Sequence, residues 1–275
     1  MPSCFLEDRG LLRVSGAEAR GFLQGLFTCD VERVSPGAPA FGALLTPQGK
    51  IITDFFLFQQ GDAFWLDVPA ELTADLLKRL RLYRLRAQID LTDMSETMGM
   101  LAVWGDDPRP AIAQPDPRHP DLGARCIMER AALTSDPAAR AAYEAQRIAC
   151  GIPQGGVDFA YGEAFPHEAN MDLIGGVDFK KGCYVGQEVV SRVHHRGTAR
   201  RRILTAELAG PAPAPGTPVL AGESEVGTLG SSAGPHALAS IRLDKAQDAS
   251  AAGAPLTAGG VALTLGALPS RARQV

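Results

Sequence analysis

The stretch from Gly175 to Arg192 reads GGVDFKKGCYVGQEVVSR and is the most unusual segment of the chain. Gly182 and Gly186 flank Cys183, and glycine allows the backbone to turn sharply and to approach other groups closely. Lys181 lies two residues before the cysteine, and a nearby ammonium favours the thiolate over the thiol. A helix predicted to begin near Gly186 would act in the same direction through its dipole. These features could make Cys183 reactive, but the residues alone favour a small buried thiol, which is the usual fate of a free cysteine.

A cluster of cations follows directly. It could hold a phosphate, a polyanion or the carboxylate tail of a ligand, or it could be a solvated hinge between domains. A Cys–His nucleophilic pair is a further alternative, but such partners must meet in space, and surface histidines are the simpler interpretation. This basic strip consists of Arg192, His194, His195, Arg196, Arg200, Arg201 and Arg202.

Upstream of this stretch, hydrophobic spacing predicts a mixed α+β body. Ser15 and Glu18 form a capping-box pattern at the start of a first helix. Ser135 or Asp136 is expected to cap another helix, in which Pro137 occupies the first turn. Five prolines within residues 105–123 predict an exposed loop. Strands are expected at 11–14, 43–45, 51–58, 64–68 and 98–104, with a tight turn at 46–49 and a helix over 70–83.

Beyond Arg202 the composition changes to short apolar runs separated by Gly and Pro. The sequence PAPAPGTP at 211–218 reads as a linker or loop. Short β-like runs at 203–207, 226–229, 237–243 and 261–265 suggest a small β-barrel or sandwich. We therefore expect residues 1–199 to form the body, as two interleaved α+β subdomains, and residues 200–275 to form a C-terminal barrel domain.

Composition restricts the function classes. The chain of 275 residues is 45% hydrophobic and 21% charged, which is typical of a globular protein of about two domains. Its net charge of −4 lacks the global basic footprint of a non-specific nucleic-acid binder. The longest apolar runs, such as 55–58, fall far short of the ~20 residues of a membrane span.

Cysteine and histidine usage predicts compartment and metal content. The chain has five cysteines, an odd number, without a C-x-x-C pair, and its N-terminus resembles neither a signal nor a transit peptide. We therefore expect free thiols in a reducing compartment, the cytoplasm. The five histidines show no metal-binding motif spacing, and we expect no metal site.

Several motifs, taken together and in order, resemble the YgfZ-type proteins, which are relatives of the glycine-cleavage T-protein (aminomethyltransferase). The most specific is K-G-C-Y-V-G-Q-E at 181–188. The resemblance covers about residues 10–205, and the β-rich tail fits the C-terminal barrel of that family. The other matching segments are F-L-Q-G-L-F-T-C-D-V at 22–31, L-L-T-P-Q-G-K at 44–50, R-I-A-C-G-I-P at 147–153 and P-H-E-A at 166–169.

The resemblance implies a three-lobed body that binds tetrahydrofolate, and a role in the assembly or repair of iron–sulfur proteins. Through such enzymes it implies an indirect role in tRNA modification. Its implied partners are a reduced folate and iron–sulfur client or assembly proteins, with RNA weakly indicated. By similarity, Cys183 and Lys181 carry the activity, and Glu168 accepts N–H bonds from the pterin edge. The other positions assigned to the folate are Arg147, Tyr184, Gln187, Glu188 and Arg192.

Two departures leave open whether the chain is an enzyme. T-protein relatives carry R-L-E-A-G where this chain has Arg147-Ile148-Ala149-Cys150-Gly151, so a carboxylate is missing. The region of their catalytic aspartate retains only Asp75. An aminomethyltransferase-like one-carbon transferase, and a scaffold that binds RNA or protein through the basic strip, therefore remain alternatives to the folate-binding accessory protein.

Overall fold

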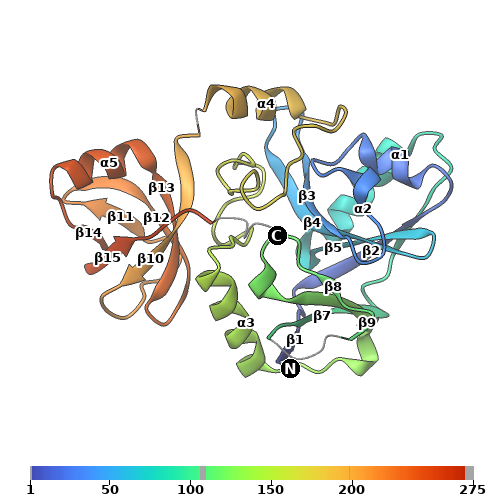
Figure 1. The fold of residues 1–275 in the computed structure, drawn as a ribbon, viewed down its shortest axis with the longest axis horizontal. Helices are drawn as coiled ribbons and strands as arrows, with labels where there is room; N and C mark the ends of the chain where they lie inside the picture. The colour runs from blue at the N-terminus through green and yellow to red at the C-terminus, as the bar shows by residue number, and fades with distance from the viewer. Residues whose placement is uncertain (1, 106–109, 198, 270–275) are drawn as a thin grey trace.

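The computed structural model describes residues 2–105, 110–197 and 199–269. Its largest sheet has five antiparallel strands in the order β3-β4-β5-β2-β6. Figure 1 shows this sheet packed beside a smaller one, with a barrel on the far side of the molecule. The strands of the large sheet are β2 (Arg9–Ser15), β3 (Ala40–Leu45), β4 (Ile51–Gln60), β5 (Ala63–Pro69) and β6 (Asp90–Asp93).

Strand β4 lies between two hydrophobic cores. Successive side chains of a strand point to opposite faces. Phe55 and Leu57 therefore enter one core, while Phe56 and Phe58 enter the other. Two helices supply leucines to the first core and cover that face of the sheet. These helices are α1 (Ala19–Gln24) and α2 (Thr73–Arg84), the latter preceded by the 3-10 turn η2 (Ala70–Leu72); the turn η1 (Val31–Arg33) follows α1.

The second sheet contributes to the other core. Its four strands are antiparallel in the order β1-β7-β9-β8. Helix α3 (Pro137–Ala149) follows this sheet, and the Asp136 side chain accepts hydrogen bonds from the N–H groups of Ala138 and Ala139, as the sequence predicts. The remaining elements are β1 (Ser3–Phe5), β7 (Met98–Val103), β8 (Gln114–Pro115), β9 (Ala124–Glu129), η3 (Pro120–Leu122) and η4 (Arg130–Ala132).

A long segment without helix or named strand, residues 150–186, connects α3 to helix α4 (Gln187–Arg196). In Figure 1 it winds through the centre of the molecule, between the two sheets and the barrel. The segment is nevertheless well buried, because Met171 and Ile174 pack into the same core as Phe56. It therefore forms part of the body and its interior.

The C-terminal domain is a closed barrel with strand order β10-β13-β12-β11-β14-β15. Its own core contains Leu229, Ile241 and their neighbours. A small cluster of Ile148, Ile203 and Leu238 joins the barrel to helix α3. The barrel elements are β10 (Arg201–Leu208), β11 (Pro218–Ala221), β12 (Ser224–Ala233), β13 (His236–Arg242), α5 (Leu243–Ala251), β14 (Leu256–Ala258) and β15 (Val261–Leu265).

The α+β class with a small C-terminal barrel is thereby confirmed, with two local corrections. Ser15 does not cap a helix, because it pairs with Asp90 at the end of β2, and the Glu18 carboxylate instead accepts the N–H of Gln88. The proline-rich segment is not simply exposed: Asp116 and Arg118 are buried within it, while residues 106–109 lie outside the described residues. None of the helices in the described part of the chain is long and apolar enough to cross a membrane.

Candidate functional site

The segment 178–186, called here the thiol loop, is held in place from its first residue. The Asp178 carboxylate accepts hydrogen bonds from the N–H groups of Lys180 and Lys181, at 2.7 and 3.0 Å. The backbone N–H of Asp178 donates to the carbonyl of Thr28 at 2.9 Å. An aspartate that caps the turn following it fixes local backbone geometry. The loop is thus attached to the segment that follows α1.

Lys181 anchors the same loop from the inside. Its Nζ donates to the carbonyl oxygens of Gln24, Phe27 and Cys29, at 2.8, 2.6 and 2.8 Å. An ammonium has three donors, so all of them are used. Burial lowers the pKa of Lys181. These contacts make Lys181 a residue that positions the loop, whereas the sequence suggested that it activates the cysteine.

Cys183 is the exposed cysteine of the five. Burial raises the pKa of Cys29 to about 12 and that of Cys150 to about 11, so both remain protonated thiols at neutral pH. A thiol must be accessible to react with another molecule. The thiol loop therefore presents Cys183 to solvent, while its neighbour Tyr184 is buried, with its pKa raised to about 12 by that burial.

The loop ends at a glycine that no other residue could replace without strain. Gly186 has φ +81°, and a Cβ there would lie 2.6 Å from the carbonyl oxygen of Thr46. Thr46 begins the tight turn 46–49, in which the N–H of Gly49 donates to the Thr46 carbonyl at 2.8 Å. Gly182, by contrast, has open space around it. The predicted role for flanking glycines therefore belongs to Gly186.

Helix α4 begins directly after Gly186, as predicted, and carries three of the residues assigned to folate. Glu188 and Arg192 form an ion pair of 2.6 Å on the exposed side of the helix. Gln187 is half-buried at its first turn. Glu168, on the preceding segment, accepts the N–H of Phe165 at 2.8 Å and thus stabilises a local turn. Figure 1 places α4 at the rim of the molecule.

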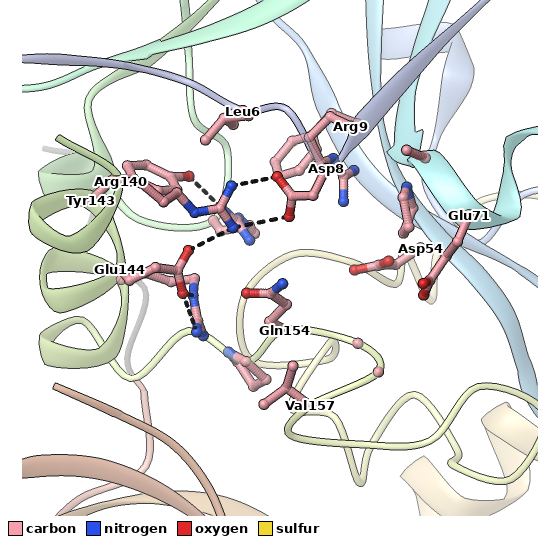
Figure 2. Close-up of a pocket in the computed structure, with 18 of the residues that line it drawn as sticks. Leu6, Asp8, Arg9, Asp54, Glu71, Arg140, Tyr143, Glu144, Gln154 and Val157 are labelled. Carbon is pink, nitrogen blue, oxygen red and sulfur yellow. Dashed lines mark hydrogen bonds and ion pairs between the residues drawn. The ribbon is translucent and has the colours of Figure 1, made fainter. Parts of the chain in front are cut away.

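A cavity lies elsewhere, where the two sheets, α3 and the segment 153–161 meet. It has a volume of about 370 Å³, and we call it the central pocket. Figure 2 shows Asp54 and Glu71 on one wall, and Arg140, Tyr143 and Glu144 of α3 on the opposite wall. Arg147 is the one residue assigned to folate from the sequence that lines it.

Buried ion pairs build the wall between these two sides. Asp67, fully buried, accepts hydrogen bonds from Arg9 and Arg125, both at 2.5 Å. Asp116 accepts from Arg118 through both carboxylate oxygens and contacts Arg125 at 3.4 Å. Burial alone would raise the pKa of Asp116, but the adjacent Arg118 and Arg125 hold it below its usual value. Buried charges in a wall of this kind require such pairing.

An aromatic ring lies under these arginines. The guanidinium of Arg125 stands 3.7 Å from the ring centroid of Phe56, and that of Arg118 stands 4.6 Å from it. A cation over an aromatic face is favourable, most of all when desolvated. The pocket therefore has a rigid, positively charged floor over an apolar base.

The remaining polar groups are oriented by their neighbours. Tyr161 donates its hydroxyl to Asp54 at 2.5 Å, and Arg140 forms an ion pair with Asp8. Burial, together with the adjacent Asp54, raises the pKa of Tyr161, so the phenol remains a donor. Glu71 is exposed at the mouth. The lining thus has Asp54 and Glu71 on one side, and on the other side Arg140, which is paired with Asp8 and Glu144.

Arg147 serves the fold more than the cavity. Its guanidinium donates to the Ile152 carbonyl at 2.6 Å and contacts Asp158 at 3.2 Å. It also donates to Glu144 at 2.7 Å and to Ser231 of the barrel at 2.9 Å. One side chain therefore connects α3, the irregular segment and the barrel.

Several members of the basic strip are already engaged in contacts within the protein. Arg202 makes a two-point ion pair with Asp172, at 2.6 and 2.9 Å, and Arg192 pairs with Glu188. The ring of His194 stacks on Phe179 at 3.7 Å. Part of the strip is thus neutralised or packed, which weakens the expectation of a polyanion site there.

Sequence reasoning missed most of the pocket. Asp54 and Asp67 each interrupt a strand that is otherwise apolar, and a buried carboxylate in such a strand requires a partner. That irregularity in IITDFFLF and AFWLDVP was the available signal. The partners, Arg118 and Arg125, come from distant segments and could not be inferred.

Comparisons with known proteins agree with this architecture. Residues 7–116 match the GCVT N-terminal domain, and residues 200–270 match the CAF17 C-terminal beta-barrel domain. The aminomethyltransferase T of the glycine cleavage system from Bartonella henselae superposes with a TM-score of 0.73. The alignment covers 97% of this chain and 85% of that one at 15% identity, so it bears on the fold alone. The chain has a GCVT-like fold with a CAF17-type barrel.

Curated relatives are more similar in sequence. The "Iron-sulfur cluster assembly factor IBA57 homolog, mitochondrial" of Coccidioides immitis is 33% identical over 261 residues, covering 80% of this chain and 61% of that protein. The protein of the same name from Mycosarcoma maydis is 34% identical over 230 residues, covering 74% and 57%. The chain thus spans about three fifths of the length of these relatives.

These names correct one expectation. The sequence analysis assigned the protein to the cytoplasm, whereas the similar curated proteins are named mitochondrial. The argument from free thiols did not distinguish the two, because both are compatible with reduced cysteines. The division of the chain after residue 199 stays a prediction.

Proposed function

We propose that this protein acts in the assembly or repair of iron–sulfur proteins and that the thiol of Cys183 is its functional group. The observation that carries the proposal is the exposure of Cys183 on a loop fixed by Lys181 and Gly186. Similarity to proteins named iron–sulfur cluster assembly factors supports the same function.

One exposed cysteine is better suited to transferring an iron–sulfur cluster than to storing it. Iron–sulfur clusters generally require four ligands, most often thiolates. A single cysteine would leave the other positions to ligands from a client or an assembly protein. Cys183 would therefore hold the cluster, as cargo, only at an interface with such a partner.

The experiment is complementation of a deletion strain by Cys183→Ser and Lys181→Met, with Cys150→Ser as the matched cysteine control. We expect Cys183→Ser to remain folded and fail to restore iron–sulfur enzyme activities, whereas Cys150→Ser restores them. Full rescue by Cys183→Ser would refute the assignment of the thiol. Where the affected enzymes modify tRNA, reduced modification would follow indirectly.

The central pocket is proposed to bind a reduced folate. Its volume of about 370 Å³ lies within the range of ligand sites, and its donor set fits the molecule. Asp54 and Glu71 are carboxylates that could accept N–H bonds from the pterin edge. Arg140, on the opposite wall, could bind the carboxylates of the tail. A bound reduced folate would supply a one-carbon carrier.

This assignment moves the folate contacts away from those expected from the sequence. Glu168 is occupied by the Phe165 N–H, and it does not line the pocket. The positions on and beside α4 do not line the pocket either, because that helix lies at the rim of the molecule. The positions concerned are Tyr184, Gln187, Glu188 and Arg192.

Calorimetric titration with tetrahydrofolate tests this part separately. We expect one-to-one binding that is weakened at least about tenfold in Asp54→Asn, the loss of one good hydrogen bond to a charged group. Glu168→Gln is the control and should bind as the wild type does. Weaker binding in Glu168→Gln but not in Asp54→Asn would place the pterin at Glu168. An absence of binding in the wild type would mean that the iron–sulfur function does not depend on folate.

The other two functions gain no support from the structure. Asp75, which marked the region of the T-protein's catalytic aspartate, pairs with Arg79 at 2.6 Å on the exposed side of α2. A scaffold that uses the basic strip would need free cations, but Arg192 and Arg202 are paired. We therefore carry neither alternative forward.

A further inference from the structure

A second cluster of chemically active side chains lies apart from the central pocket. His167, Asp172 and His194 place one donor atom each within 4.8 Å of one another. They come from two separate elements, because His167 and Asp172 belong to the irregular segment and His194 to the last turn of α4. The sequence offered no motif here, since the spacing of five and then 22 residues matches no metal-binding pattern.

The most informative member is His167. It is 2% exposed, and neither of its ring nitrogens has a hydrogen-bond partner among the described residues. A buried polar group left without a partner destabilises the fold, so each ring nitrogen is available to a ligand.

The other two members are oriented toward it. Arg202 of β10 binds both oxygens of Asp172, which fixes the carboxylate and leaves lone pairs on each oxygen. The His194 ring stacks on Phe179 at 3.7 Å, and its centroid lies 6.2 Å from that of His167. Partners that orient a ligand without binding the ion are typical of metal sites.

We propose that His167, Asp172 and His194 form a binding site for a divalent first-row transition ion such as Zn²⁺. Two imidazoles and one carboxylate are a ligand set that such ions prefer. At bond lengths of about 2.0–2.1 Å, tetrahedral donors lie roughly 3.3 Å apart. The donor atoms, which lie within 4.8 Å of one another, therefore have to approach by up to about 1.5 Å, through side-chain rotation of all three residues.

The site would connect the body to the barrel. Arg202, which fixes Asp172, also donates to the His167 carbonyl at 2.8 Å. An ion bound here would join the irregular segment to α4 at the point where the chain enters the barrel. The positive charge of Arg202 next to the ion reduces the net attraction, so we expect micromolar rather than picomolar affinity.

The test is Co²⁺ binding followed by visible absorption, with Zn²⁺ competition by calorimetry, on the full chain. We expect one ion per chain with d–d bands and no thiolate charge-transfer band. Because His194 is exposed, His194→Ala should fold normally and lower the affinity at least about 100-fold, more than loss of an outer partner does. His167→Gln should do the same, with folding checked by circular dichroism.

Two matched controls complete the design. His195→Ala changes the adjacent exposed histidine and should leave the affinity unchanged. His119→Ala removes a member of the other potential cluster, His119, Asp121 and Cys150, and should also have no effect. A thiolate band, loss of binding in His119→Ala, or no binding below millimolar concentration would each overturn the proposal.

Discussion

The thiol loop and the wall of the central pocket both bury charged side chains, but they compensate the charge differently. In the loop, one ammonium is surrounded by three neutral backbone carbonyls. In the pocket wall, the buried arginines are paired with Asp67 and Asp116. Carbonyls do not titrate and carboxylates do, so the comparison teaches that the two regions should respond differently to substitution and to pH.

The largest effect is expected in the pocket wall. Asp67→Asn removes the charge that neutralises Arg9 and Arg125, and breaking a buried pair in this way costs about 3–5 kcal/mol. Urea denaturation would measure the free energy of unfolding. The matched control is Asp75→Asn, which breaks an exposed pair with Arg79 and should cost less than about 1 kcal/mol. Equal losses would mean that the buried network is not essential to stability.

Lys181→Met tests the loop in the same terms. It leaves the carbonyls of Gln24, Phe27 and Cys29 without their donor, which we expect to cost about 2–3 kcal/mol. Hydrogen exchange should accelerate over 24–29 and 178–186, while the pocket wall stays protected. Lys180→Met, at an exposed neighbouring lysine, should change neither. Faster exchange throughout the chain would contradict a local anchor.

Gly186→Ala probes the end of the loop. At φ +81° an alanine is strained by about 1–2 kcal/mol, and its Cβ would meet the Thr46 carbonyl at 2.6 Å. We expect a lower melting temperature and a displaced Cys183, which reaction of the thiol with a bulky maleimide would report. Gly182→Ala is the matched control, because space is open there. Similar melting temperatures for both variants would show that the turn at 46–49 yields easily.

The mildest perturbation is acid, which acts on the carboxylates around the pocket and not on the carbonyls around Lys181. Burial alone would raise the pKa of Asp116 and of Asp8, but their arginine partners lower both. A lowered native pKa contributes stability above the unfolded value of about 3.9, and this is lost as pH falls through the native value. The free energy of unfolding should therefore stay level from pH 7 to about 5 and fall below about 4.

Urea titrations at pH 7, 5, 4 and 3 would measure this profile, with Asp116→Asn as the comparison. The variant is less stable throughout but should lose less stability on acidification. A decline already present between pH 7 and 5 would point to histidines rather than to these carboxyls.

Local pattern was sufficient for most of the fold. The strand at 51–58, the cap at Asp136 and the short strands after Arg202 each depend on neighbours a few residues away, and each prediction is confirmed. Ser15 shows the limit of such rules, since pairing with Asp90 in the sheet prevailed over a capping signal.

The site was predictable only where it is contiguous. The motif 181–188 singled out Cys183, whose exposure only the structure shows, and the three carbonyls around Lys181 lie more than 150 residues away in sequence. The central pocket combines strands, α3 and irregular chain, so its composition depends on tertiary packing that no local rule encodes. Glu168 was assigned to folate by resemblance, and its hydrogen bond from the Phe165 N–H could not be inferred from the sequence.

Arg147 has one more consequence. Because this arginine touches the pocket wall, the Ile152 carbonyl and Ser231 of the barrel, the barrel and the pocket share a single side chain. By thermodynamic linkage, a molecule that displaced Arg147 at the pocket would also change its contact with Ser231, and a molecule that bound the barrel through that contact would be coupled to the pocket by the same factor. Occupancy of the cavity and recruitment of a partner protein would then be one equilibrium measured at two places.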